Sequence, residues 1–433
     1  MPLGMIRQMM RTVARPGLPA LLALVLAGCD ALLEVDAPSR VIGETLEGPG
    51  NAALLVAGAV ADFECTFSHY IVTTGLIGDE LKDTQLAAAT WDYDRRSLNP
   101  AVGAAYAQGT CDAGGNIISV YQPVNMARFA ADNALSKLES FTEQQVPNRS
   151  LLIATAAAYS GYSHLLLGEG FCSAVLLGDD LTPGGESTRV QVFQNAEARF
   201  TRALASGSND ASMLGLARVG RARARLNLGR YAEAEADARL VPANFVRNAA
   251  FTDIATRPSN KVTRWNRRFR WASVEDDYFN LSFGGVADPR VRLTNSGLRG
   301  ADAVSIVWYA DKYATESSPI QIATWEEAQL MIAEAQVRAG NGQAAVTIIN
   351  DLHTRVGLPA FVSTDNAVIL QQVIDERRRE LFLEGQHLGD AIRYNLPLTP
   401  AVGAPYPIKG GSYGTTRCMP LPDVERINNP NFR

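Results

Sequence analysis

Apolar residues recur at the spacing of an amphipathic α-helix over most of this 433-residue chain, and no other sequence feature restricts its fold as strongly. The pattern is clearest in residues 324–339, where the apolar side chains share one side and the charged side chains lie on the others. Strand-like patterns are scarce, and residues 304–309 are one candidate. The sequence therefore predicts a mainly α-helical protein. Helical patterns cover residues 118–143, 150–168, 190–205, 211–228, 230–240, 322–339, 343–355 and 366–385, and another begins at Asn51.

Two of these helix pairs, in residues 217–240 and 333–352, share a signature that resembles tetratricopeptide (TPR) units. Small residues allow the two helices of each pair to approach closely, and Gly229 or Gly340 stands at the turn between them. Two such units are too few to form a solenoid by themselves. We therefore expect a TPR-like helix-pair scaffold on which other segments lie.

Long intervals separate the helical patterns, namely residues 64–117, 170–189, 243–321 and 386–433. Loops of this length inside a compact domain are usually functional or disordered. These intervals contain four of the five tryptophans and many tyrosines, which is too much aromatic mass for disorder. We expect long aromatic-rich loops packed on one face of the helical scaffold.

The first thirty residues are typical of an export signal. Arginines at positions 7, 11 and 15 precede an apolar run over residues 18–27, which is shorter than the ~20 apolar residues that a membrane-spanning helix needs. The run ends in Leu26-Ala27-Gly28-Cys29, which resembles a bacterial lipobox and implies cleavage before Cys29 and a lipid anchor on it. An ordinary signal peptide that contains a cysteine, or an internal start, is the alternative. We predict a signal peptide at 1–28, a lipidated tether at 29–50 and one domain at 51–433.

Four further cysteines, Cys65, Cys111, Cys172 and Cys418, form an even set in a chain expected to be exported. Three pairings are open to them, and we favour Cys65–Cys111 with Cys172–Cys418, because the first two lie in one N-terminal stretch. Four free buried thiols are the alternative. No CxxC motif is present, which argues against a zinc ribbon.

Composition and motifs argue against nucleic-acid binding and catalysis. Forty Lys and Arg against 45 Asp and Glu exclude a polybasic nucleic-acid binder as the default. HExxH, Walker, EF-hand and post-strand GxGxxG motifs are missing. Residues 161–165 begin like a nucleophile elbow, but they lack its final glycine and lie inside a helical pattern. His164 lies at an apolar helix end, and we expect it to be a hydrogen-bonded core residue. We predict no enzyme, no cofactor and no metal. Two acidic pairs that a glycosidase could use are Asp79 with Glu80 and Asp92 with Asp94, but neighbours in sequence say nothing about the separation that this chemistry requires.

Ordered sequence blocks over residues 318–433 resemble the SusD/RagB family of outer-membrane nutrient-binding lipoproteins. The most specific block reads Val373-Ile374-Asp375-Glu376-Arg377-Arg378-Arg379-Glu380-Leu381-Phe382-Leu383-Glu384-Gly385. The N-terminal half matches more loosely, through the lipobox and residues 33–38. The sequence departs from the family at His387, where arginine is usual. The whole stretch between residues 170 and 320 is also short for the family. The resemblance implies a SusD-like, mainly α fold.

The resemblance also implies a function: a lipid-anchored, cell-surface protein of the outer membrane that captures a nutrient. The nutrient would be a glycan or a peptide, delivered to a SusC-like TonB-dependent outer-membrane barrel. Sugar sites favour aromatic platforms, and the loop candidates are Trp91, Tyr93, Trp265, Trp271, Trp308, Tyr309 and Tyr313. Arginines flank Trp265 and Trp271 and could face an acidic ligand or the partner barrel.

Other interpretations remain beside this one. The charged block at Glu376, Arg379 and Glu380 is interpreted as architectural, with ion pairs that join the last helix to the loops. A lipid-anchored TPR-like scaffold without a small-molecule ligand is the alternative function, although such a scaffold has no need of aromatic loops. A secreted glycan hydrolase is the third class.

Overall fold

The structure is a computed structural model that describes residues 47–86, 88–111, 118–178, 181–427 and 429–432. The predicted signal peptide at 1–28, the lipidation site Cys29 and the tether up to residue 46 lie outside the described residues. From Glu47 onward the chain forms one compact unit. Glu47 belongs to this unit, because its carboxylate lies 2.7 Å from the Lys137 ammonium.

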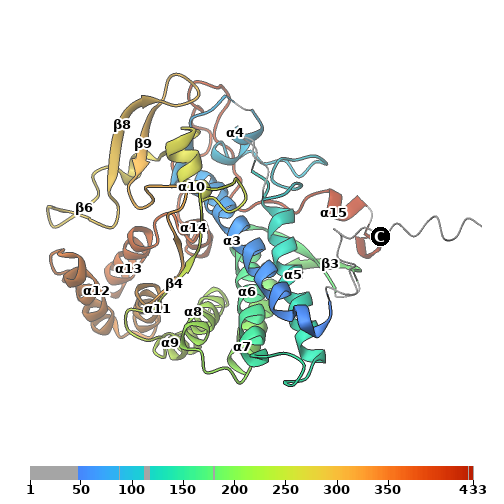
Figure 1. Ribbon diagram of the computed structural model, residues 1–433. Coiled ribbons are helices and arrows are strands. Elements are labelled where there is room, and N and C mark those ends of the chain that lie inside the picture. The colour runs from blue at the N-terminus through green and yellow to red at the C-terminus, as the bar shows by residue number, and fades with distance from the viewer. Residues whose placement is uncertain (1–46, 87, 112–117, 179–180, 428, 433) are drawn as a thin grey trace, which may run out of the picture. The chain divides into compact units, whose positions relative to one another are not determined.

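The first group of helices surrounds a central, mostly buried helix (Figure 1). Helix α6 contacts α3, α5, α7 and α8. It is long and apolar enough to cross a membrane, but 83% of its most apolar stretch is buried by the rest of the protein. It is therefore the core helix of this group. The bounds are α3 (Ala52–Ile77), α5 (Tyr121–Ser140), α6 (Arg149–Gly170) and α7 (Arg189–Leu204).

Helix α3 differs from the expectation of a long loop from residue 64. It continues to Ile77, and nearly every residue from Phe63 onward is buried. Helix periodicity is visible in a sequence only when one side of the helix faces water. The second half of α3 is buried all round and so lacks that signal.

Glycines allow α6, α7 and α8 to approach each other closely. A Cβ atom at Gly161 of α6 would lie 2.7 Å from the Phe200 ring of α7, and Gly220 of α8 meets the same ring. Gly161 thus serves packing.

His164 of the same helix is 2% exposed, and its Nδ1 lies 2.9 Å from the Ser160 carbonyl oxygen, which confirms the prediction of a hydrogen-bonded core histidine.

The two TPR-like helix pairs are confirmed. Helix α8 pairs with α9, α11 pairs with α12, and α9 packs against α11. Gly229 and Gly340 stand between the paired helices with φ of 72° and 84°, a left-handed backbone that favours glycine. Helix α13 packs against α11 and α12. The bounds are α8 (Ala211–Asn227), α9 (Tyr231–Ala238), α11 (Trp325–Arg338), α12 (Gly342–Val356), α13 (Asn366–Glu380) and α14 (His387–Arg393). We call the helices of both groups the helical frame.

Strands of the described residues form two-stranded antiparallel pairs: β1 with β5, β2 with β3, β4 with β10, β6 with β7 and β8 with β9. The strand predicted at 304–309 is present as β9. The bounds are β1 (Leu81–Asp83), β2 (Ser173–Leu177), β3 (Pro183–Thr188), β4 (Val246–Ala249), β5 (Ala272–Val274), β6 (Ser282–Phe283), β7 (Val286–Ala287), β8 (Leu293–Arg299), β9 (Ile306–Ala310) and β10 (Ile320–Thr324).

Short helical turns complete the described elements. They are η1 (Pro49–Asn51), α4 (Ala88–Asp94), α10 (Lys261–Thr263), the π-helical η2 (Arg264–Arg268), η3 (Asp276–Tyr278), α15 (Val424–Ile427) and η4 (Pro430–Phe432).

The favoured disulfide pairing is confirmed. Cys65 and Cys111 are bonded with their Cα atoms 5.8 Å apart, and Cys172 and Cys418 with Cα atoms 5.2 Å apart. The second bond joins residues 246 positions apart, and the Cys172 N–H donates to the Met419 carbonyl at 2.9 Å. The C-terminal loop is thereby fixed to the helical frame.

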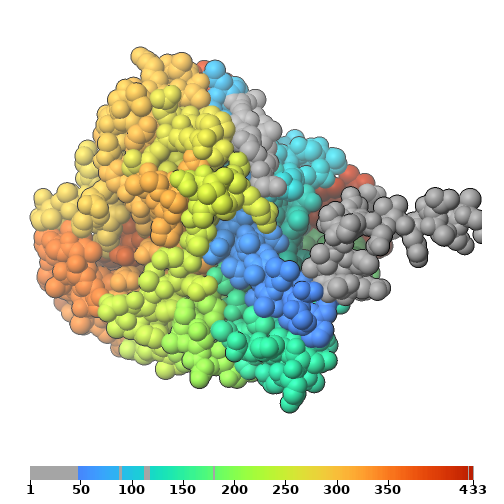
Figure 2. Space-filling view, in the orientation of Figure 1, coloured from blue at the N-terminus to red at the C-terminus, as the bar shows by residue number. Residues whose placement is uncertain are grey.

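Parts of three loop intervals gather on one side of the helices, whereas the interval 170–189 forms the β2–β3 hairpin and packs on α6 and α7, which differs from the prediction of a single loop face. In Figure 1, α4, α10, β8 and β9 lie at the top of the view and α7 and α9 at the bottom. In Figure 2, residues 243–321, yellow to orange, cover the upper left of the face, above green helices.

Candidate functional site in the aromatic loop layer

Three segments far apart in the sequence form a continuous layer, which we call the aromatic loop layer. Strand β1 pairs with β5, with Leu81 opposite Val274. The Trp308 N–H of β9 donates to the Ser273 hydroxyl of β5 at 2.9 Å, and β9 pairs with β8. The layer also includes α4, η2, residue 279 and the loop at 400–413.

One aromatic pair lies at the join between these segments. The rings of Phe279 and Trp308 are 4.3 Å apart between centroids and tilted by 31°. Both side chains are half-buried, and the Lys82 ammonium lies 5.6 Å from the Phe279 centroid. The pair therefore combines a partly exposed aromatic surface with a nearby cation. Phe279 was not among the sequence candidates, and its position in a long aromatic-rich loop is the one signal that could have found it.

A second stack accounts for the arginines around Trp265 and Trp271. The Phe269 ring stacks on Trp271 at 4.3 Å and 14°, and Trp271 meets Trp265 edge to face at 5.4 Å. Arg264 and Arg268 lie over Phe269, and each guanidinium forms a 2.8 Å ion pair with the Glu316 carboxylate.

A third arginine of the same cluster, Arg267, is paired with Asp311 at 2.7 Å. Each of these three arginines is thus paired with a carboxylate, and Arg264 and Arg268 share one, Glu316. An acidic ligand would have to compete with carboxylates that already occupy the cluster.

The seven predicted aromatic residues divide into two groups. Tyr93, Trp265 and Tyr313 are at most 3% exposed and fill the core, where the Tyr313 hydroxyl donates to the Leu383 carbonyl at 3.1 Å. They have almost no surface to offer a ligand, because the loops above them close over their rings. The other four are half-buried in the aromatic loop layer and stay candidates: Trp91, Trp271, Trp308 and Tyr309.

A polar cleft of about 180 Å³ adjoins this layer. A buried ion pair between Asp83 and Lys409 lies on its wall. Asp94 accepts hydrogen bonds from the Asp83 N–H at 2.7 Å and the Tyr406 hydroxyl at 3.0 Å. Burial raises the pKa of Asp94 to about 7 in spite of these two donors. The cleft therefore holds both donors and acceptors beside an aromatic surface. Its other lining residues are Lys82, Asp302, Ser305, Ile306, Pro407, Ile408 and Tyr413.

The tyrosines and the lysine from the C-terminal loop were missed by the sequence analysis. Tyr406 and Tyr413 meet edge to face at 5.1 Å, and Lys409 lies 5.8 Å from the Trp91 ring. These residues are over 300 positions from β1, and only the tertiary fold brings them to it.

The acidic pairs considered for a hydrolase are held in structural contacts. Asp79 lies 3.1 Å from the His387 ring and accepts a backbone N–H, and Glu80 is 1% exposed. Asp92 is bound to Arg95 at 2.6 Å. Asp94 is buried as described above. No group of three or more His, Cys, Asp or Glu side chains that could hold a metal ion occurs among the described residues.

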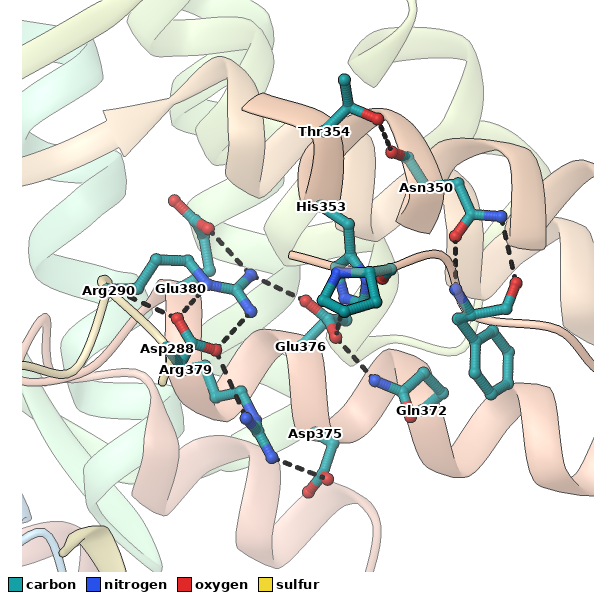
Figure 3. Close-up of polar contacts among 12 residues, drawn as sticks. Asp288, Arg290, Asn350, His353, Thr354, Gln372, Asp375, Glu376, Arg379 and Glu380 are labelled. Atoms are coloured by element: carbon teal, nitrogen blue, oxygen red, sulfur yellow. Dashed lines mark hydrogen bonds and ion pairs between the residues drawn. The ribbon is translucent and has the colours of Figure 1, made fainter. Parts of the chain in front are cut away.

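The charged block of α13 joins the frame to the loops (Figure 3). Arg290, which precedes β8, forms ion pairs of 2.7 Å with both Asp288 and Glu376, and one of 3.2 Å with Glu380. His353 of α12 lies 2.7 Å from Glu376. Burial favours the neutral acid, but the cationic partners outweigh it and lower the pKa of Glu376. These contacts agree with the architectural interpretation of the block.

Frame and layer together define a class of protein, a scaffold of helix pairs that carries an aromatic face of extended loops. The family model described as "SusD family" matches residues 327–418. This match places a segment similar to the SusD family in the C-terminal part of the chain.

Individual relatives agree with this placement. The starch-binding protein SusD of Bacteroides thetaiotaomicron is 30% identical over 169 residues, which cover 35% of this chain and 29% of that protein, so the chain spans less than a third of this curated relative. A SusD-like carbohydrate binding protein from Bacteroides vulgatus has a similar solved structure, with a TM-score of 0.66 and 15% identity over 89% of this chain and 97% of its own. A SusD superfamily protein from Parabacteroides distasonis gives a TM-score of 0.65 and 15% identity over 90% and 98%.

Proposed function

We propose that this chain binds carbohydrate through its aromatic loop layer, as a lipid-anchored outer-membrane protein on the cell surface that passes the ligand to a TonB-dependent SusC-like barrel. The carbohydrate part is supported by two similar proteins, one a starch-binding protein and one a SusD-like carbohydrate binding protein. The anchor is supported by the lipobox that ends at Cys29.

The observation that carries the proposal is the Phe279–Trp308 pair beside the polar cleft. A sugar ring stacks its C–H face on an aromatic ring, while its hydroxyl groups need donors and acceptors nearby. The aromatic pair supplies the first kind of contact, and Lys82 and the carboxylates of the cleft supply the second.

The test is affinity electrophoresis in gels that contain soluble starch and, in parallel gels, other soluble glycans. We expect Trp308→Ala to weaken binding of the retained glycan about fivefold or more, because a lost sugar–aromatic stack costs more than about 1 kcal/mol. Trp325→Ala is the matched control, since Trp325 is also half-buried but lies in the helical frame against Arg355. Equal loss in both variants would contradict a site in the layer.

Delivery to a barrel is tested by affinity purification from detergent-solubilised outer membranes. Recovery of a stoichiometric β-barrel receptor with the wild-type protein, and loss of membrane attachment in Cys29→Ser, are the expected results. Recovery of an assembly machine, with no glycan retained in any gel, would favour the alternative of a lipid-anchored scaffold without a ligand.

A further inference from the structure

A second cleft of about 380 Å³ lies in the frame, on residues that belong to α5, α6, α7 and the β2–β3 hairpin. None of its lining residues belongs to the aromatic loop layer. The charged side chains that line it are Arg128 and Asp132 of α5 and Arg199 of α7, and His164 of α6 is also present. Two guanidinium groups and one carboxylate therefore face one cavity.

Both arginines depend on the same carboxylate. The Arg128 Nη1 lies 3.0 Å from one Asp132 oxygen, and the Arg199 Nε lies 2.8 Å from the other. The Ser160 hydroxyl also donates to Asp132. Burial alone would raise the pKa of Asp132, but the surrounding cationic groups and this hydroxyl outweigh it and lower the pKa. One carboxylate cannot balance two guanidinium groups, so among the described lining residues the Arg128–Asp132–Arg199 cluster carries a net positive charge.

Arg128 shows this shortage of negative charge most clearly. Its side chain is 4% exposed, and its Nε and Nη2 are buried without a hydrogen-bond partner among the residues that the structure describes. In other arginines of this protein, the Nε and Nη2 atoms donate to one carboxylate in a bidentate pair, as in Arg221 with Asp237 and Arg290 with Asp288. A buried guanidinium with unmet donors is costly, and a further anion nearby lowers that cost.

Arg199 provides the accessible donors. Its side chain is 39% exposed, and the ion pair with Asp132 is recorded at its Nε, so the partly exposed guanidinium can present its Nη groups to a ligand. Leu176, Leu177 and Ala198 supply apolar walls, and Asn195 an amide. Planar guanidinium groups match carboxylates in geometry, and apolar walls suit an organic body more than an inorganic ion.

We propose that this cleft binds a small organic carboxylate, held by the Nη groups of Arg199 and attracted by the net charge of the Arg128–Asp132–Arg199 cluster. The site is separate from the aromatic loop layer and does not depend on carbohydrate binding there. A sugar acid is one such carboxylate, and D-glucuronate is the probe of choice because D-glucose is its neutral counterpart.

The test is isothermal titration of the full chain with D-glucuronate, D-glucose and inorganic phosphate at low and physiological salt. We expect glucuronate to bind, glucose to show no comparable binding at this site, and salt to weaken the interaction because the cleft is open to solvent. Arg199→Gln should weaken glucuronate binding at least tenfold, and Arg199→Lys should restore part of it. Arg202→Gln is the matched control: Arg202 lies on the same helix and its side chain pairs with exposed Glu139.

Three results would overturn the proposal: no glucuronate binding by the wild type, equal binding by Arg199→Gln, or phosphate binding as tight as glucuronate. Arg199 is partly exposed, so its variants are expected to fold, and circular dichroism checks this. Trp308→Ala separates the two proposals, because it should leave glucuronate binding intact while it weakens glycan retention.

Discussion

In the helical frame, long helices pack on each other through apolar and small side chains with ion pairs among them, such as Arg199 with Asp132, whereas in the aromatic loop layer short strands are joined by ring stacks and ion pairs. Gly161 and Gly220 allow two helices to pack on one Phe200 ring. In the layer, β1 and β5 pair over three residues each, and Trp308 is tied to β5 by a hydrogen bond to a side chain. Local regularity therefore stabilises the frame, and contacts between distant segments stabilise the layer.

The two regions meet at the network around Arg290. This side chain precedes β8, and its partners Glu376 and Glu380 lie on α13. The network lets the frame hold segments that have little regular structure of their own. Buried ion pairs of this kind give specific geometry, and they are sensitive to the loss of one partner.

The largest effect is expected from Glu376→Ala, which breaks this joint. It leaves Arg290 buried with fewer negative partners and also removes the contact of His353. We expect a loss of about 3–5 kcal/mol in the free energy of unfolding, measured by urea titration. Asp351→Ala is the control, because its pair with Arg355 is exposed and contributes about 0.5 kcal/mol or less. Similar losses in both variants would show that the network is not the joint.

Removal of the disulfides tests two covalent links that lie outside the Arg290 network. Replacing Cys172 and Cys418 by serine should cost about 2–5 kcal/mol, since the bond restricts a long loop in the unfolded chain. Replacing Cys65 and Cys111 should cost about 1.5 kcal/mol less, because that bond spans 46 positions and the other 246. Urea unfolding of both double variants measures the difference. The reverse order would mean that native contacts, and not loop length, set the effect.

Packing in the frame is tested with two glycines. Gly161→Ala forces a Cβ against the Phe200 ring and should cost about 1–3 kcal/mol. Gly58 lies on an exposed part of α3, where an added Cβ would meet no neighbouring side chain or segment within 4 Å. Gly58→Ala should therefore stabilise the protein by about 0.5–1 kcal/mol. Thermal unfolding should therefore shift in opposite directions. A neutral Gly161→Ala would show that the ring moves aside freely.

The smallest effect per unit of the variable changed is a pH dependence that arises in the aromatic loop layer. Burial raises the pKa of Asp94 to about 7, from an ordinary value near 3.8. Between about pH 4 and 7 the unfolded chain ionises this group while the folded chain keeps it protonated, so stability falls as pH rises and levels off above 7. Asp94→Asn should reduce this slope by about 1 kcal/mol per pH unit. Urea unfolding at pH 4.5, 5.5, 6.5 and 7.5 measures it, and an unchanged slope would assign the pH dependence to other groups.

Much of the fold could be predicted from sequence, because an amphipathic helix repeats its apolar residues every three to four positions. The helices at 190–205 and 211–228, for example, correspond closely to α7 and α8. The second half of α3 could not be predicted, since a helix buried on all sides shows no such period. The candidate site was predictable only in part: Trp308 and Tyr93 look alike in the sequence as loop aromatics, yet one is half-buried and the other 0% exposed.

By itself the sequence determined the helical class, the TPR-like pairs, the family blocks of residues 318–433 and a lipobox at Cys29. These features depend on residues close together in the chain or on their order. The tertiary structure alone decided that Phe279 stacks on Trp308, that Tyr406 reaches Asp94, and that Arg128 and Arg199 share Asp132. The reason is physical: exposure, ring contacts and charge balance are set by neighbours in space, many of which lie tens to hundreds of residues apart in the chain.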